Sequence, residues 1–442
     1  MDLQQFIARN YDNEPYWFVS FCGDVKHQVR INEILDKKEY LNGKHYITTR
    51  PNEKFNGQEF ETRRIMLNYA KTILNFQTAY LLKNPTTLSG DSKVVKEFKK
   101  VYNRAKLHRI DHDILDKMIK YGNSYEYLYF DNKQNIKSKL IAPEDSYPIY
   151  DHANNMIGFV EHYTVDFVSY WTVYTDNMVY EYDNAQGETP QLTSESTNIS
   201  GLPIAYINEN ELSDVYGKSN LDDLISILDS LEMLVSKAND GFYKYITGIP
   251  VVTGQQLTNS NLPNDIIGGG LNLDDGATFD FKTNKFDHQA FKTLYDNLIN
   301  ALLDISSTPA VSMNKAEISN LSEVSIKLLF NLADIKASLN AKYLEDGFDE
   351  RFERIRRMLE YKGITFSDDD YNTLDVVFSP STPKNEKEII DNLVALRGIS
   401  AVSIESILEN VPYINDKVEE MKRLDNESEN VDNVDKGNKV DE

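Results

Sequence analysis

Residues 286–305 read FDHQAFKTLYDNLINALLDI, and residues 323–361 read EVSIKLLFNLADIKASLNAKYLEDGFDERFERIRRMLEY. Large apolar residues recur every three or four positions in both stretches, so each predicts an amphipathic helix. At about 1.5 Å per residue, the second helix would be more than roughly 50 Å long, with a kink expected at Gly347. Between them, Thr308–Ser322 is a polar segment that is longer than the connection needs. Taken alone, this loop is either a surface connection or a functional segment.

The remaining sequence divides into helical regions and one β-rich region. From Asn123 to Asn208 the hydrophobic period changes to two, and aromatic and β-branched residues become frequent, which predicts an antiparallel sheet with meander connections. Val251–Thr283 is predicted to contain short strands and tight turns between two helices. Further helices are predicted at Val25–Tyr40, Phe60–Leu82, Ser219–Ile246, Lys384–Leu396 and Val402–Leu408, followed by a disordered acidic tail from Asp425.

Length and charge restrict the class of protein. The chain has 442 residues, more than the roughly 250–300 at which one hydrophobic core stops growing, so several domains or one elongated domain are expected. Its 70 acidic and 47 basic residues give a net charge of −23. This charge disfavours tight binding to DNA phosphates, and it suits either plain solubility or a passage along which DNA slides without adhering.

Cysteine content and hydropathy add two expectations. Cys22 is the single cysteine, which excludes an intrachain disulfide and a cysteine-based zinc site. We find no secretion signal and no run of about 18 apolar residues, so no membrane partner is expected.

Three motifs have a chemical and a structural interpretation. Gly268-Gly269-Gly270 lacks the following Gly-Lys-Ser/Thr of a nucleotide-binding loop, so we interpret it as a turn and expect no cofactor. His108 and His112 have the spacing of two metal ligands on a helix, but a solvated helix face explains them as well. Asp368-Asp369-Asp370 could hold magnesium or mark a helix N-terminus, and we favour the helix. We therefore expect no catalytic and no metal site.

Five stretches together make the chain similar to a known family. They are Tyr40–Ile47, Tyr69–Pro85, Tyr121–Glu126, Leu202–Ile204 and Thr308–Pro309. In these stretches, and in the order of elements up to about Leu424, the chain resembles the portal proteins of long-tailed (siphovirus-type) bacteriophages of Gram-positive bacteria. The resemblance implies a structural, non-enzymatic virion protein, made in the host cytoplasm and placed at the portal vertex of the capsid.

The resemblance also implies an α+β fold and a division of the chain. The subunit would be elongated and would assemble into a ring, with long stem and wing helices, an antiparallel β-rich wing and a small α/β clip. By order along the chain, the parts would be a wing at 1–217, a stem helix at 218–247, a clip at 248–285, a second stem helix at 286–306, a tunnel loop at 307–322, a long wing helix and following strand at 323–382, a crown at 383–424 and the acidic tail at 425–442.

Partners and site residues follow from the same resemblance. The expected assembly is a homo-oligomeric ring, a dodecamer, through which double-stranded DNA passes during packaging and ejection without sequence-specific contact. Other partners would be the terminase large subunit, a head–tail connector protein, and the major capsid and scaffolding proteins. The DNA-facing residues of the tunnel loop would be Ser312, Asn314, Lys315, Glu317, Ser319 and Asn320, with Lys315 the first candidate for phosphate contact. The partner-docking residues of the clip would be Gln255, Asn264, Asp265, Asp274 and Asp275.

Two functions of other classes remain open from the residues alone. One is a metal-dependent nuclease that uses Asp368–Asp370, and the other is a cytoplasmic adaptor with no role in DNA handling.

Overall fold

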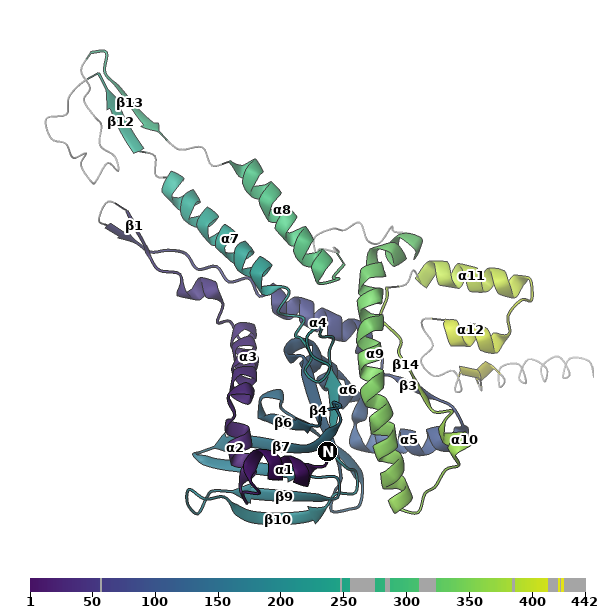
Figure 1. Cartoon of the computed structure of the whole chain (residues 1–442). Coiled ribbons are helices and arrows are strands. Elements are labelled where there is room, and N and C mark those ends of the chain that lie inside the picture. Colours follow the sequence, from purple (N-terminus) through teal and green to yellow (C-terminus); the bar gives the residue numbers. More distant parts are fainter. Residues whose placement is uncertain are drawn as a thin grey trace, which may run out of the picture. The chain divides into compact units, whose positions relative to one another are not determined.

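The structure is a computed structural model that describes residues 1–55, 58–246, 249–254, 275–282, 287–309, 323–383 and 386–411, together with 420, 421, 423 and 424 (Figure 1). The chain divides into two compact units. Unit 1 contains Met1–Thr308 and Ile335–Pro380, and unit 2 contains Pro309–Asp334 and Ser381–Glu442. Helices and antiparallel sheets occur together, which confirms the predicted α+β class.

The N-terminal helices of unit 1 pack on a five-stranded antiparallel meander. The sheet has the order β10-β9-β8-β7-β6. Its strands are β6 (Ser146–Tyr150), β7 (Met156–Val165), β8 (Val168–Tyr174), β9 (Met178–Asp183) and β10 (Gln191–Thr197), and the helices are α1 (Leu3–Tyr11), α2 (Trp17–Gly23) and α3 (Val25–Leu41). Trp17, Phe18 and Phe21 of α2 form one core cluster with Trp171 and Val173 of β8. Burial of this aromatic surface, at roughly 25 cal/mol per Å², holds α2 on the sheet.

A second sheet of unit 1 has three strands in the order β11-β4-β5. They are β4 (Asn123–Phe130), β5 (Ile136–Ile141) and β11 (Ile204–Ile207), and α6 (Leu107–Tyr121) contacts all three. The predicted meander therefore holds from β6 to β10, but the chain then returns to pair β11 with β4. Ser200 fixes this return, because its buried hydroxyl donates to the Leu128 carbonyl at 2.6 Å.

Residues 58–82 differ from the helix predicted at Phe60–Leu82. Helix α4 begins only at Tyr69 and ends at Leu82, while strand β2 (Gln58–Phe60) pairs with β1 (Glu53–Phe55). The backbone N–H groups of Arg63, Ile65 and Leu67 donate to side chains of another helix, described below, so they are not available for helical bonds. Other elements of this part of unit 1 are η1 (Tyr46–Thr49), β3 (Thr87–Ser89), α5 (Ser92–Ala105) and η2 (Pro143–Asp145).

Two helices and a two-stranded sheet follow one another along the chain (Figure 1). Helix α7 (Ile225–Ile246) contacts α8 (His288–Ile305), and β12 (Ile249–Thr253) pairs antiparallel with β13 (Thr278–Lys282) between them. The strands predicted within Val251–Thr283 are thus confirmed. α7 begins at Ile225, after the predicted Ser219, because the preceding residues form turns: the Asp222 N–H donates to the Ser219 carbonyl at 3.2 Å and the Leu224 N–H to the Leu221 carbonyl at 2.9 Å.

Helix α9 (Glu323–Tyr361) has 39 residues and is followed by α10 (Asp368–Tyr371) and β14 (Asp375–Val377), which pairs with β3. The helix continues through Gly347, where a kink was predicted. Instead, Gly347 permits close packing, because a Cβ there would lie 2.3 Å from atoms of the Tyr206 ring. In unit 2, α11 (Glu386–Gly398) and α12 (Ile404–Asn410) confirm the two predicted helices, and the tail from Asp425 lies outside the described residues.

Replacing Gly347 with Ala should lower the free energy of unfolding of unit 1 by about 1–3 kcal/mol, because the added methyl group overlaps the buried Tyr206 ring. Urea unfolding followed by circular dichroism measures the change. Gly23→Ala is the matched control, since no atom lies within 4 Å of a Cβ at that position. Equal stability of the two variants would contradict the packing role of Gly347.

Candidate functional site

The ends of α7 and α8 that lie near α4 are joined by two amide side chains. Gln77 lies on α4 and is 6% exposed. Its Nε2 donates to the Ser306 carbonyl at the end of α8 (2.8 Å), and its Oε1 accepts from Nδ2 of Asn220, which precedes α7 (2.8 Å). One side chain of α4 thus holds the beginning of α7 and the end of α8.

Helix α9 joins the same cluster. The Asn220 Oδ1 accepts from the Asn208 Nδ2 at 3.0 Å and from the Lys336 Nζ at 3.4 Å. Burial lowers the pKa of Lys336, while the carboxylates of Glu209 and Asp223 act in the opposite direction. We refer to Gln77, Asn220, Ser306 and Lys336 as the helix anchor. Ser306 and Lys336 precede and follow the predicted tunnel loop in sequence, so unit 1 holds the chain on both sides of it.

The end of α8 has a defined C-terminal cap. Ser307 has a positive φ of 52°, the left-handed conformation typical of the residue after a helix. The Thr308 N–H donates to the Leu303 carbonyl at 2.9 Å, and the Ser306 hydroxyl donates to the Thr308 Oγ1 at 2.9 Å. These bonds fix the direction in which the chain leaves α8 toward residue 309.

A polar stripe along one face of α7 binds the segment 45–67. Its members are spaced three or four residues apart and therefore share a helix face: Asp229, Glu232, Ser236 and Asp240. The central residue, Glu232, is fully buried, and its Oε1 accepts from the Leu67 N–H at 2.8 Å and lies 2.6 Å from the His45 Nδ1. The Tyr40 ring stacks on the His45 imidazole with centroids 4.1 Å apart.

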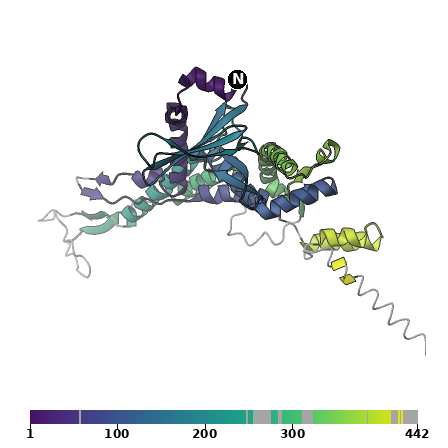
Figure 2. The same ribbon diagram turned by 90° about the horizontal axis from the view of Figure 1, so that it is seen from below.

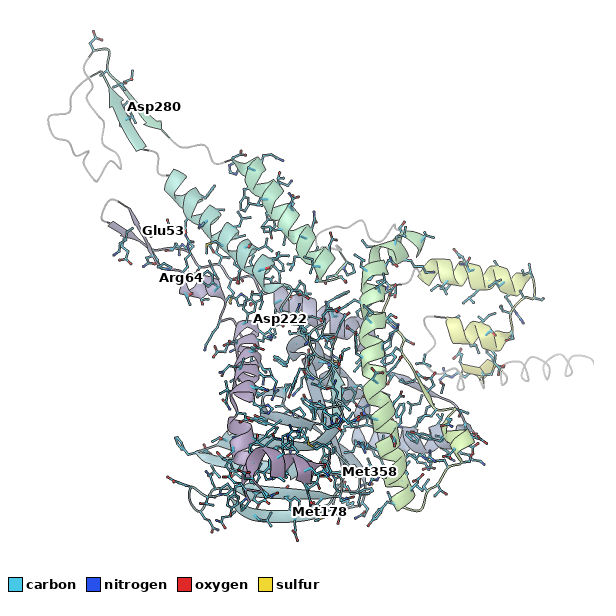
Figure 3. The ribbon with its side chains drawn as sticks, viewed as in Figure 1. Glu53, Arg64, Met178, Asp222, Asp280 and Met358 are labelled. Atoms are coloured by element: carbon cyan, nitrogen blue, oxygen red, sulfur yellow. The ribbon has the colours of Figure 1, made fainter. Side chains whose placement is uncertain are left out.

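Two further members of the stripe, Ser236 and Asp240, bind the same segment further along, whereas Asp229 accepts from the Tyr40 hydroxyl at 3.4 Å. The Ser236 hydroxyl accepts from the Ile65 N–H at 2.9 Å. Asp240 accepts from the Arg63 N–H at 2.9 Å and pairs with the Arg50 guanidinium at 3.0 Å. Figure 3 shows Glu53 and Arg64 on this segment near α7. Because these bonds are directional, they fix both the rotation and the position of α7 along its axis.

A buried guanidinium connects α9 to the second sheet and to α6. Arg351 is 0% exposed, and its Nε donates to the Glu126 carboxylate of β4 at 2.8 Å, while its Nη1 donates to Asp111 of α6. Glu126 also accepts from the Tyr206 hydroxyl at 2.7 Å and from the Ser138 hydroxyl at 2.5 Å. Burial raises the pKa of Asp111, and the positive charge of Arg351 opposes that shift.

The residues predicted for the tunnel loop and the clip are not brought together by the described structure. All six tunnel-loop residues, Ser312 to Asn320, lie outside the described residues, as do Gln255, Asn264, Asp265 and Asp274. Asp275 is described, and it lies exposed in the turn before β13. These assignments therefore stay predictions.

The helix anchor was missed by sequence reasoning. Gln77 was counted within an apolar helix, although it is a polar residue between the buried Leu74 and Leu81 on that helix. A polar residue at a core position of an amphipathic helix is the signal that could have indicated a buried hydrogen bond. Nothing in the sequence indicates its partners Asn220 and Ser306, which are more than 100 residues away.

The acidic candidate metal motif has a structural role. Asp368, Asp369 and Asp370 form the first turn of α10, where the Ser367 hydroxyl accepts from the Asp370 N–H at 3.1 Å and the Arg356 guanidinium pairs with Asp368 at 2.5 Å. This confirms the interpretation as a helix N-terminus. Within the described part of the chain, no group of three or more His, Cys, Asp or Glu side chains is arranged to hold a metal ion. No helix in that part has the length and apolar character needed to cross a membrane.

Comparison with protein families connects this architecture to a known class. Residues 24–433 match the family described as phage portal protein, SPP1 Gp6-like. The chain belongs to this family. It is therefore a structural, non-enzymatic component of the virion at the portal vertex, and the family implies a ring oligomer. The nuclease and adaptor alternatives find no support in this assignment. A comparison with curated proteins gives no match.

Three solved structures with similarity to this portal protein come from gene transfer agent (GTA) particles. The neck of the empty particle, computed with C6 symmetry, has a TM-score of 0.46 at 10% identity and covers 76% of this chain and 87% of that one. The neck of the native particle, computed with C12 symmetry, has a TM-score of 0.44 at 11% identity, covering 78% and 91%. The virion of the native particle has a TM-score of 0.42 at 10% identity, covering 76% and 86%.

Replacing Gln77 with Ala should lower the free energy of unfolding by about 1–3 kcal/mol, because the buried Ser306 carbonyl and the Asn220 amide both lose their partner. Chemical unfolding of the purified chain measures the loss. Gln289→Ala, at an exposed position of α8, serves as the control and should change stability by less than about 0.5 kcal/mol. A similar small effect at both positions would contradict the helix anchor.

Proposed function

We propose that this chain forms the dodecameric portal ring of a long-tailed phage of Gram-positive bacteria, with α7 and α8 as the stem around double-stranded DNA. The observation that carries the proposal is an apolar stripe on α8 that the described chain covers only in part: Leu298 and Ala301 are half-buried, whereas Leu294 and Ile305 are exposed. The stripe consists of Leu294, Leu298, Ala301 and Ile305, spaced three or four residues apart. Leu294 is 49% and Ile305 is 54% exposed, although Leu302 on the adjoining face is buried.

Such a stripe favours contact between copies of the chain. One side of α8 already packs against α7, so the exposed stripe leaves a second apolar face on a helix that extends from the sheets (Figure 1). A neighbouring subunit that packs on this stripe removes apolar surface from water, and repetition of the same contact around an axis gives a closed ring.

The passage of DNA rests on charge and on the position of the tunnel loop. A net charge of −23 disfavours tight binding to phosphates overall, so DNA can slide past the ring. Ser312, Asn314, Lys315, Glu317, Ser319 and Asn320 are the proposed DNA-facing residues, with Lys315 making brief phosphate contacts. The helix anchor supports this role, because it holds the chain in unit 1 before and after the loop.

The remaining parts are assigned by their order along the chain. We assign the wing to 1–217, the stem to 218–247 and 286–306, the clip to 248–285 and the crown to 383–424. The clip, with Asp275 beside the β12–β13 pair, is the proposed docking site for the terminase large subunit and the head–tail connector protein. The major capsid and scaffolding proteins are the proposed partners of the outer parts of the ring.

Replacing Leu294 with Asp tests the ring contact directly. The variant should assemble at least about tenfold less well than the wild type, because a charge would be placed in an apolar interface, while the exposed position keeps the subunit folded. Light scattering and negative-stain images report the assembled fraction. Asn300→Asp adds the same charge to an exposed position on another face of α8 and should leave assembly unchanged. A wild-type chain that remains monomeric at micromolar concentration would contradict the ring.

Replacing Lys315 with Glu tests the DNA-facing loop. Packaging of DNA into capsids should fall, because the only basic side chain of the loop segment 308–322 would become repulsive to phosphate, while rings still form. Packaged DNA per particle is measured after nuclease treatment, with Lys315→Gln as the intermediate variant. Normal packaging by Lys315→Glu would remove Lys315 from the proposed function.

A further inference from the structure

An acidic cleft lies on the surface of unit 1. The cleft has a volume of about 730 Å³ and lies between α9, the turn between β6 and β7, and the loop after β11. Five exposed carboxylates line it: Glu209, Glu211, Asp214, Asp346 and Glu350. Among the described residues, none of these five forms an ion pair, and Arg354 is the one basic residue in the lining.

A buried amide in the same cleft also lacks a partner. Asn208 lines the cleft and is 3% exposed. Its side-chain Nδ2 donates hydrogen bonds to the Lys218 carbonyl and to the Asn220 Oδ1. Its Oδ1 is buried and accepts no hydrogen bond from the described residues. Buried polar atoms are nearly always satisfied, so this oxygen is an acceptor of the cleft wall that the described residues leave open. A cleft with unpaired carboxylates and a free carbonyl oxygen fits Lys or Arg side chains, which only donate.

The chain itself carries a matching basic surface. Helix α5 buries Val94, Phe98, Val101 and Tyr102 against unit 1 and exposes basic residues on the opposite face. The basic face consists of Lys93, Lys96, Lys99, Lys100 and Arg104. Lys100 pairs with Glu97 at 2.5 Å, whereas Lys93, Lys96 and Lys99 form no ion pair with the described residues. In a chain with a net charge of −23, this concentration of positive charge on one helix face stands out.

The acidic cleft and the basic face lie on different sides of unit 1. The cleft borders the turn between β6 and β7, where Asp151 lies 3.7 Å from the N-terminal ammonium of Met1. Figure 2 shows the N-terminus and α1 on one side of the sheets and α5, in blue, on the other. Complementary surfaces on two sides of a subunit are what a closed head-to-tail ring requires.

We propose that the acidic cleft of one subunit receives the basic face of α5 from the adjacent subunit in the ring. This inference rests on the proposed ring and adds to it a specific ionic contact, separate from the apolar stripe of α8. Lysine side chains of α5 pair with the exposed carboxylates of the cleft. Because like charges in the wrong register repel, the contact also fixes how neighbouring subunits align.

Charge exchange tests the contact. Lys93→Glu with Lys96→Glu should reduce the assembled fraction about fivefold or more at low salt, and Glu209→Lys with Glu211→Lys should do the same. Combining all four substitutions should restore assembly to within about twofold of the wild type, because the attraction is re-established with exchanged signs. Light scattering and native mass spectrometry measure assembly, and the thermal unfolding midpoint shows that the subunits remain folded. Lys26→Glu and Asp176→Lys, at exposed positions elsewhere, are the matched controls.

The outcomes distinguish failure of this contact from failure of the proposed ring. Intact assembly of both double variants, with a wild-type ring present, would overturn the contact and leave the ring standing. Loss without recovery in the combined variant would overturn the pairing of these two surfaces. If the α5 variants instead assemble normally and bind a short DNA duplex less tightly, the basic face is a nucleic-acid surface and the contact is wrong. A wild-type chain that forms no ring would overturn the proposed function, and this contact with it.

Discussion

The rest of unit 1 depends on the buried charge of Arg351. A guanidinium without contact to water is stable only when carboxylates and hydrogen-bond acceptors compensate its charge. Glu126, Asp111 and Tyr102 accept from the Arg351 Nε and Nη1, whereas its Nη2 has no partner among the described residues. These partners come from β4, α6 and α5, so one side chain of α9 connects three elements. Removal of a single partner would leave a buried charge uncompensated, which costs several kcal/mol, so this cluster requires α9 to lie in one position.

The position of α9 determines what its other residues can reach. Lys336 lies on the same helix, and with α9 fixed by Arg351 it meets Asn220. Asn220 in turn bonds Gln77, which holds the end of α8. The path from the buried charge to the helix anchor therefore consists of two rigid helices, α9 and α4, and a few polar contacts. In this way the body of unit 1 sets where the chain enters and leaves the segment proposed to meet DNA.

Periodicity predicted those elements whose structure is determined by which face is buried. The helices α3, α8 and α9 and the antiparallel strands from Asn123 onward were found because their apolar residues repeat at 3.6 or 2 residues. The predicted start of α4 was wrong, because backbone N–H groups of residues 63–67 donate to side chains of α7. A local sequence pattern contains no information about such distant partners. The helix anchor was not predicted for the same reason, since Gln77 and Ser306 are far apart in sequence. The tunnel-loop residues remain predictions from family resemblance.

The polar stripe of α7 has a mechanical consequence. Helices that pack through apolar side chains can slide or roll by small steps at little cost, because dispersion contacts are not directional. α7 instead engages the N–H groups of Arg63, Ile65 and Leu67 through three carboxylate or hydroxyl acceptors, and a shift of one turn would break all three bonds together. These bonds therefore prevent α7 from sliding along its axis relative to the segment 45–67. A force applied along α7 at its far end is transmitted to the rest of unit 1.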